Sequence, residues 1–95
     1  MSFFDSEILQ EEMQTTSNLV ELLKSQDLSE SDRIETMQTW IDKTKIFYTR
    51  LTLTDNDEAM KLKKELDEKA NLLGFSDTSQ CLNNLQELVD AMKTQ

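Results

Sequence analysis

The spacing of apolar residues predicts two long helical segments in the first half of the chain. The first covers about residues 5–26, where apolar side chains recur every three or four positions on one broad face. Its apolar residues are Ile8, Leu9, Met13, Leu19, Val20, Leu22 and Leu23. The polar stretch QDLSES interrupts the pattern, and a second segment covers about residues 31–53. The stripe of the second segment consists of Ile34, Met37, Trp40, Ile41, Thr44, Phe47, Tyr48 and Leu51.

Two shorter helical segments follow in the second half. The third covers about residues 56–73 and has a narrow apolar stripe made of Ala59, Leu62, Leu66, Ala70 and Leu73. Gly74 is the only glycine and stands where a helix favours a left-handed residue after its last turn, so Phe75 is expected to fold back on that turn. The fourth segment covers about residues 78–93, with a stripe of Leu82, Leu85, Leu88, Val89 and Met92.

Polar residues at the segment boundaries predict where the helices begin. Ser29 or Ser31 is expected to cap the second helix. Asp55, with Glu58 three residues later, resembles a capping box for the third helix. The polar residues 76–78 are expected to cap the fourth.

The lengths of these segments predict an all-α fold, a small helical bundle in one domain spanning residues 1–95. The two long segments are joined by a short connection and should form an antiparallel hairpin, which the two shorter helices cover. Trp40 and Phe47 lie one heptad apart and should pack against the first segment. With one Gly and no Pro, the chain lacks the residues that tight β-hairpin turns require.

The charge of the chain narrows the classes of partner. Its 19 acidic and 10 basic residues give a net charge of −9, whereas nucleic acids and anionic membranes attract cationic surfaces. We therefore expect no direct nucleic-acid binding and no membrane binding. No apolar run is long enough to span a bilayer, no signal-peptide pattern is present, and the single Cys81 cannot form an intrachain disulfide. A cytoplasmic protein is the simplest interpretation.

The residue types that carry most enzyme chemistry are scarce. There is no His, one Cys and no glycine-rich loop, so catalytic triads, thiolate zinc sites and phosphate loops have no basis. Cys81 is interpreted as a small buried residue, and the DNDE stretch at residues 55–58 as a helix cap rather than a calcium loop. The sequence therefore predicts a non-enzymatic protein without a cofactor or metal.

Glu12 is an unusual residue because it lies within the apolar arc of the first segment. A carboxylate at such a position either extends to solvent, pairs with a cation of the same chain, or contacts a partner. Both the intrachain and the partner-binding alternatives stay open at this point.

A second candidate surface lies on the second segment, opposite its apolar stripe. Ile46 and Leu53 are seven residues apart there, with Lys43 and Arg50 among the basic residues around them. A cationic patch around apolar side chains on an acidic chain is the most partner-like surface in the sequence. Alternatively, these are scattered surface apolar residues, which are common, or another part of the chain covers Ile46.

Phe3 and Phe4 form an apolar pair just before the first segment. Phe4 precedes Asp5 and could form a hydrophobic staple with Leu9. Phe3 either packs on another helix of the chain or anchors on a partner or second copy.

Several of these residues carry a resemblance to a known family. The features that carry it are "FFDSEI" near the N-terminus, Glu12, the Ile46–Phe47 pair, and "LGF" followed by a polar cap and a final amphipathic helix. With these features the chain resembles, from end to end, a small uncharacterised domain-of-unknown-function family of cyanobacteria and cyanophages. The resemblance implies a bacterial or infected-cell cytoplasm and supplies no activity and no catalytic residues. The absence of Pro and the share of Lys, Asn and Thr suit a phage copy.

Together these patterns predict a small acidic module that binds another protein, and in a phage it would modulate a host or phage machine. The candidate partner-binding residues are Phe3, Phe4, Glu12, Lys43, Ile46, Arg50 and Leu53. A homodimer through the long hairpin is also expected, because the two long segments are apolar over much of their circumference. The alternative function is an anionic mimic that blocks a nucleic-acid-binding protein. A small-molecule enzyme with Glu12 and Tyr48 in an internal polar pocket is a third and weaker hypothesis.

Overall fold

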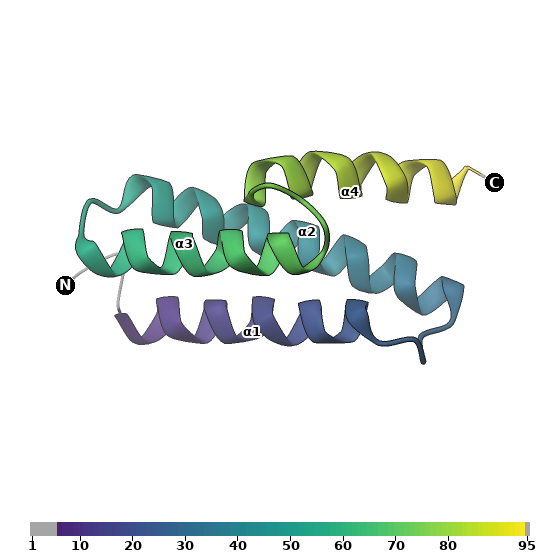
Figure 1. Cartoon of the computed structure of the whole chain (residues 1–95), viewed down its shortest axis with the longest axis horizontal. Coiled ribbons are helices and arrows are strands. Elements are labelled where there is room, and N and C mark those ends of the chain that lie inside the picture. The colour runs from purple at the N-terminus through teal and green to yellow at the C-terminus, as the bar shows by residue number, and fades with distance from the viewer. Residues whose placement is uncertain (1–5, 95) are drawn as a thin grey trace.

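The computed structural model describes residues 6–94, and these form four helices with no strand among them (Figure 1). The helices are α1 (Ser6–Lys24), α2 (Glu30–Leu53), α3 (Asp57–Leu72) and α4 (Thr78–Lys93). The all-α prediction is therefore confirmed, and the segment boundaries agree to within about two residues.

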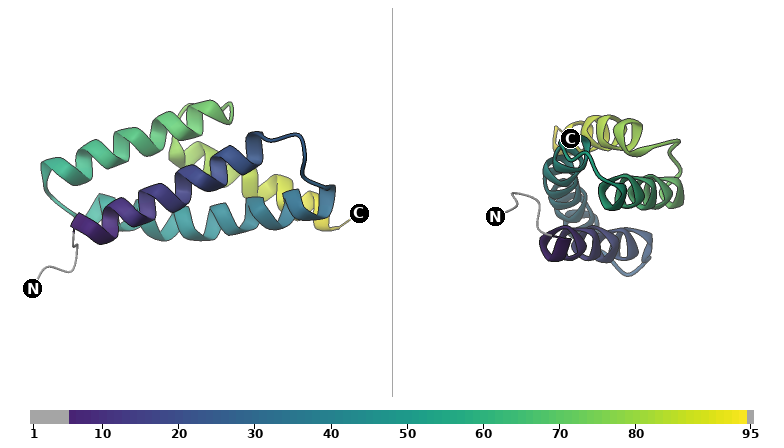
Figure 2. Two further views of the ribbon diagram at one scale, coloured as in Figure 1. Left: turned by 90° about the horizontal axis from the view of Figure 1, so that it is seen from below. Right: turned by 90° about the vertical axis from the view of Figure 1, so that its left-hand side faces the viewer.

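The long helices α1 and α2 form an antiparallel hairpin, and the shorter helices cover one side of it (Figure 2). Helix α3 packs on both α1 and α2, whereas the backbone of α4 runs beside α2 and α3 and not beside α1. Figure 1 shows that α4 is displaced along the axis of the bundle relative to α3, so the two helices cover different halves of α2. The molecule is consequently elongated, with extents of 46 × 22 × 22 Å.

The core consists of two apolar clusters that lie one after the other along α2. Trp40 is fully buried in the first cluster, with Val20 and Leu23 of α1 and with Cys81 and Val89 of α4. The second cluster is centred on the buried Phe47 and includes Leu9 and Met13 of α1 and Leu62 and Leu66 of α3. The predicted packing of Trp40 and Phe47 against the first helix is confirmed.

Helix α1 buries a narrower face than its apolar pattern predicts. Ile8 and Leu22 belong to the expected apolar face, yet they are 45% and 47% exposed. The reason is the tertiary arrangement, because α1 runs beside α2 and α3 alone and its outer side stays uncovered.

Arg33 closes the short connection between α1 and α2. Its guanidinium donates hydrogen bonds to the carbonyl oxygens of Leu23 and Ser25 at the end of α1, each at 2.7 Å.

The helix starts agree with the predicted caps in two cases and differ in one. The side chain of Ser29 accepts a hydrogen bond from the backbone N–H of Asp32, as expected of an N-cap. The cap of α3 is Asn56 rather than Asp55, and its side chain accepts from the N–H of Ala59 at 2.8 Å. The predicted capping box is wrong because Glu58 accepts hydrogen bonds from side chains of α1 instead of bonding back to the cap. At the start of α4, Asp77 accepts from the N–H of Gln80.

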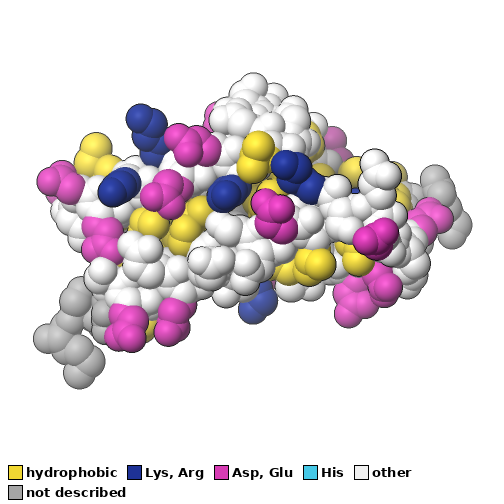
Figure 3. Space-filling model, turned by 60° about the horizontal axis from the view of Figure 1, so that its bottom comes forward, with side chains coloured by type: hydrophobic (Ala, Val, Ile, Leu, Met, Phe, Trp, Pro, Cys, Tyr) yellow, Lys and Arg dark blue, Asp and Glu magenta, His cyan; other side chains and the backbone are white. Residues whose placement is uncertain are grey.

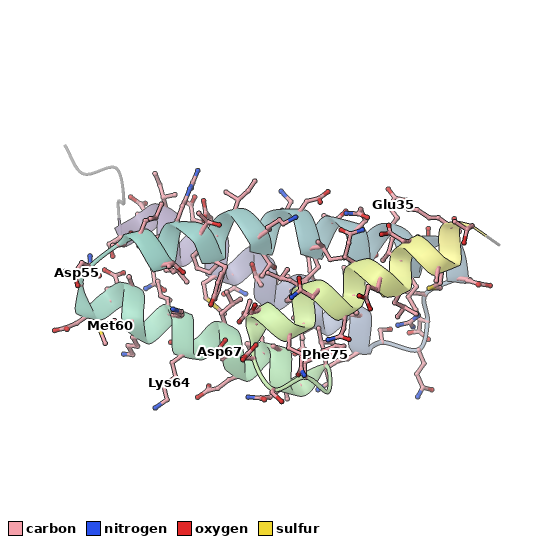
Figure 4. The ribbon with its side chains drawn as sticks, turned by 90° about the horizontal axis from the view of Figure 1, so that it is seen from above. Glu35, Asp55, Met60, Lys64, Asp67 and Phe75 are labelled. Carbon is pink, nitrogen blue, oxygen red and sulfur yellow. The ribbon has the colours of Figure 1, made fainter. Side chains whose placement is uncertain are left out.

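The end of α3 has the predicted left-handed glycine. Gly74 has φ of 96°, and its N–H donates to the carbonyl of Asn71, while the N–H of Phe75 donates to the carbonyl of Ala70. This pair of bonds is the Schellman motif, and Phe75 packs against the first core cluster (Figure 4). A Cβ at position 74 would meet nothing within 4 Å, so backbone conformation alone explains the glycine.

None of the helices between residues 6 and 94 is long and apolar enough to cross a bilayer.

Candidate functional site

Helices α1 and α2 form an open groove on the outer side of the hairpin, which we call the α1–α2 groove. Helix α1 contributes Ile8, Glu11, Glu12, Thr15 and Thr16, and α2 contributes Lys43, Ile46 and Arg50. Its volume is about 360 Å³. Neither α3 nor α4 lines it, so the groove is a feature of the hairpin alone. Figure 3 turns the α1 side toward the viewer and shows apolar side chains reaching the surface between acidic and basic ones.

Glu12 and Arg50 form an ion pair across the groove. The Glu12 side chain is 27% exposed and that of Arg50 is 42% exposed, so the pair lies half in the protein and half in solvent. The carboxylate oxygen Oε1 accepts from the guanidinium, whereas Oε2 is buried and has no hydrogen-bond partner among the described residues. The intrachain ion pair therefore engages one oxygen of the Glu12 carboxylate, and the other oxygen has no partner among the described residues.

The predicted patch on α2 is exposed. Ile46 is 57% exposed and lies in the groove between Lys43 and Arg50. Leu53 is 72% exposed at the end of the same helix and does not line the groove. Among the described residues, nothing covers either side chain as a core contact would. Phe3 and Phe4 lie outside the described residues, so their proposed staple and partner contacts stay predictions.

The groove also contains residues that are not among the candidates from the sequence. Ile8 belongs to the expected apolar face of α1, and Glu11, Thr15 and Thr16 are polar neighbours of Glu12. One signal was available: the polar pairs Glu11–Glu12 and Thr15–Thr16 interrupt the apolar pattern of α1 one helical turn apart. Their location beside Ile46 depends on how α1 and α2 pair, which a single helix pattern does not specify.

Two further polar contacts between helices involve residues that do not line the groove. Glu58 of α3 accepts hydrogen bonds from Ser6 and Gln10 of α1, and these two bonds lower the pKa of the Glu58 carboxyl. Lys63 lies over the ring of Tyr48 at 5.3 Å from its centroid, a cation–π contact. Tyr48 is thus on the α3 side of α2, away from the groove that holds Glu12, and the structure does not bring the two together.

The described residues offer no further cluster of metal-ligand type. No group of three or more His, Cys, Asp or Glu side chains between residues 6 and 94 gathers as a metal site would. Cys81 is fully buried in the first core cluster, as predicted, and burial raises the pKa of its thiol from 9.0 to about 12.

The raised pKa of Cys81 predicts a loss of stability at alkaline pH. The native state holds the thiol proton up to about pH 12, whereas the unfolded chain releases it near pH 9. Between these values the unfolded state binds fewer protons, so the free energy of unfolding falls as pH rises, by at most about 1.4 kcal/mol per pH unit.

The comparison is with Cys81→Ala, which lacks the thiol and is otherwise the same chain. The stability advantage of the wild type over Cys81→Ala should shrink as pH rises from 9 toward 11 in urea titrations. A difference that is constant across this range contradicts the buried, protonated thiol.

The fold and the groove define a small four-helix bundle with an open two-helix surface site. Within that class, the chain belongs to the family described as "Domain of unknown function (DUF1825)", whose model matches residues 1–95. The resemblance stated from the sequence is thereby confirmed at the level of the family. No curated protein and no solved structure shows significant similarity to the chain.

Proposed function

We propose that this chain is a small acidic, non-enzymatic module that binds another protein through the α1–α2 groove. The observation that carries the proposal is the chemistry of this groove. A half-exposed Ile46 lies between Lys43 and Arg50 on a chain of net charge −9, and α3 and α4 leave this face uncovered. Isolated exposed apolar residues are common, but apolar groups in a concave surface rimmed by charge are typical of docking sites.

Several features favour binding over catalysis. The groove is open, and Arg50 is engaged in an ion pair with Glu12 of the same chain. The single thiol, that of Cys81, is buried and protonated. On the family resemblance, we place this module in the cytoplasm of a cyanobacterium or of a phage-infected cell. There it would modulate a cellular machine.

The alternative of an anionic nucleic-acid mimic is less well supported. A mimic needs carboxylates along one continuous ridge, as on a nucleic-acid backbone. On the hairpin face, Lys43 and Arg50 oppose Glu11 and Glu12 across the groove. A cationic nucleic-acid-binding protein would therefore meet cations in the middle of this face.

The proposal predicts a site-specific, saturable contact at Ile46. A photoreactive amino acid replaces Ile46 in one variant and Lys64 in a matched control, since Lys64 points outward from α3 (Figure 4). Irradiation in cyanobacterial lysate should give a protein adduct from position 46 only. Excess unlabelled wild type should suppress an adduct with any protein other than this chain, and Ile46→Asp should not. Equal adducts from both positions, or suppression by Ile46→Asp, contradict the groove as the docking site.

A further inference from the structure

The α1–α2 groove has its charges sorted by helix. The α1 edge carries the carboxylates of Glu11 and Glu12, and the α2 edge carries the cations of Lys43 and Arg50. The groove is thus close to neutral, although the whole chain has a net charge of −9. Within the described residues, neither Glu11 nor Lys43 forms an ion pair, so one charge on each edge is free to pair with something outside the chain.

Both edges also carry the spacing of a helix–helix seam. On α2, Lys43, Ile46, Arg50 and Leu53 follow one another at intervals of three and four residues. On α1, Ile8 and Leu22 are half exposed and fourteen residues apart, with exposed Thr15 midway between them. These intervals are those with which one helix packs lengthwise on another. Charged residues within such a seam lower affinity but fix register and orientation.

We propose that the occupant of the α1–α2 groove is a second copy of this chain, related by a two-fold axis that runs parallel to α1 and α2. The proposal rests on the proposed function in taking this groove as the docking surface. An axis parallel to the helices lays α1 of one copy on α2 of the other. The four long helices then form a bundle in which neighbouring helices are antiparallel, the common geometry of such bundles.

The charge pattern favours this axis over the alternative two-fold axis, which also lies in the plane of the groove but runs perpendicular to the helices. A two-fold axis perpendicular to the helices would lay α1 on α1 and α2 on α2, so that the acidic edges of the two copies face each other and the cationic edges face each other. The parallel axis instead brings the acidic edge of each copy onto the cationic edge of the other. Like charges directly opposed across an interface are unfavourable, and opposite charges fix its register.

The same pattern favours a second copy over other partners. An acidic partner would be repelled by Glu11 and Glu12, and a basic partner by Lys43 and Arg50. A complementary surface must carry both signs, separated by about the distance between two packed helices, with apolar groups between them. The groove of a second copy has this arrangement by symmetry. Repulsion between the acidic remainders of the two chains is screened beyond about 8 Å at physiological salt.

Sedimentation equilibrium of charge-reversed variants tests the proposal. The wild type should reach twice the chain mass of 11.1 kDa at micromolar concentration. Glu11→Lys and Lys43→Glu each place like charges on facing edges twice per dimer, so each should weaken association about tenfold. The double variant exchanges the two signs and should recover most of the wild-type affinity.

Two controls carry the same changes in net charge elsewhere. Lys64→Glu and Glu68→Lys alter exposed positions on α3 and should leave the dissociation constant within about twofold of the wild type. Circular dichroism establishes that every variant keeps the helical content of the wild type. Effects of the same size in the groove and control variants would overturn the proposal, because total charge would then explain them.

Two further results would overturn it. If Glu11→Lys strengthens association, α1 lies on α1 and the axis is wrong. If the wild type keeps a mass of 11.1 kDa at all concentrations and salts, the second copy is not the occupant. In that case a competed adduct from position 46 would still support docking of a different protein, so failure of the dimer is distinguishable from failure of the proposed function.

Discussion

Trp40→Ala should lower the free energy of unfolding by about 3–5 kcal/mol, as large aromatic-to-Ala changes in cores do. Trp40 is fully buried among residues of α1, α2, α3 and α4, so its removal leaves a cavity at the point where the first core cluster joins all four helices. Its indole Nε1 has no hydrogen-bond partner among the described residues. The loss therefore comes from apolar packing and not from a broken hydrogen bond.

Urea unfolding followed by circular dichroism measures this effect. A small domain has a total stability of about 5–15 kcal/mol, so Trp40→Ala risks complete unfolding. Trp40→Phe keeps an aromatic ring and should give a smaller, measurable loss. Ile46→Ala, on the same helix but exposed, is the matched control and should change stability by less than about 0.5 kcal/mol. A loss below about 1 kcal/mol for Trp40→Ala would contradict the buried position.

Asp67→Ala should have the second largest effect, a loss of about 2–4 kcal/mol from two charge-assisted hydrogen bonds. Asp67 Oδ1 accepts from the backbone N–H of Thr78 at 2.9 Å and from its hydroxyl at 2.6 Å. Thr78 is fully buried at the start of α4, and Figure 4 shows Asp67 on α3 beside that turn. The substitution leaves two buried donors without a partner and removes a carboxylate from the positive end of α4.

The conservative variant Asp67→Asn separates the hydrogen bonds from the charge. Its side-chain carbonyl can accept from Thr78, so it should lose about 1 kcal/mol or less. Hydrogen exchange localises the effect, because the first turn of α4 should exchange faster in Asp67→Ala and little faster in Asp67→Asn. Exchange that accelerates equally in all four helices, or an equal loss in both variants, would contradict a local contact between α3 and α4.

Much of the fold was predictable from local patterns. The stripes of α2 and α3 identified their buried residues, because each of these helices buries the face that its apolar spacing defines. The expected stripe of α4 is only partly buried, since Leu85 and Val89 are in the core whereas Leu88 is 48% exposed.

Gly74 identified the end of α3, since a positive φ strongly favours glycine. The cap of α3 was placed one residue early. Asp55 and Asn56 are both good cap residues, and the side chain of Glu58 was taken by α1.

The candidate site was predictable only on one of its two helices. Lys43, Ile46 and Arg50 could be selected because they lie opposite the apolar stripe of their own helix. Ile8 and Glu11 could not be selected in this way. The pattern of α1 shows where its apolar face lies, but it does not show how much of that face the neighbouring helices cover. Glu12 was recognised as unusual, yet its partner Arg50 lies 38 residues away in sequence.

Periodicity, charge and residue types along the chain were sufficient to establish four helices, most of their buried residues and an acidic chain. The helices and their apolar stripes depend on intervals of three and four residues, which the sequence displays directly. The displacement of α4 from α1, the ion pair across the hairpin and the open groove beside it required the packed helices. Contacts between residues far apart in sequence depend on which helices become neighbours and how far one is shifted along another. Several such arrangements satisfy the same stripes, and the packing of the complete core selects among them.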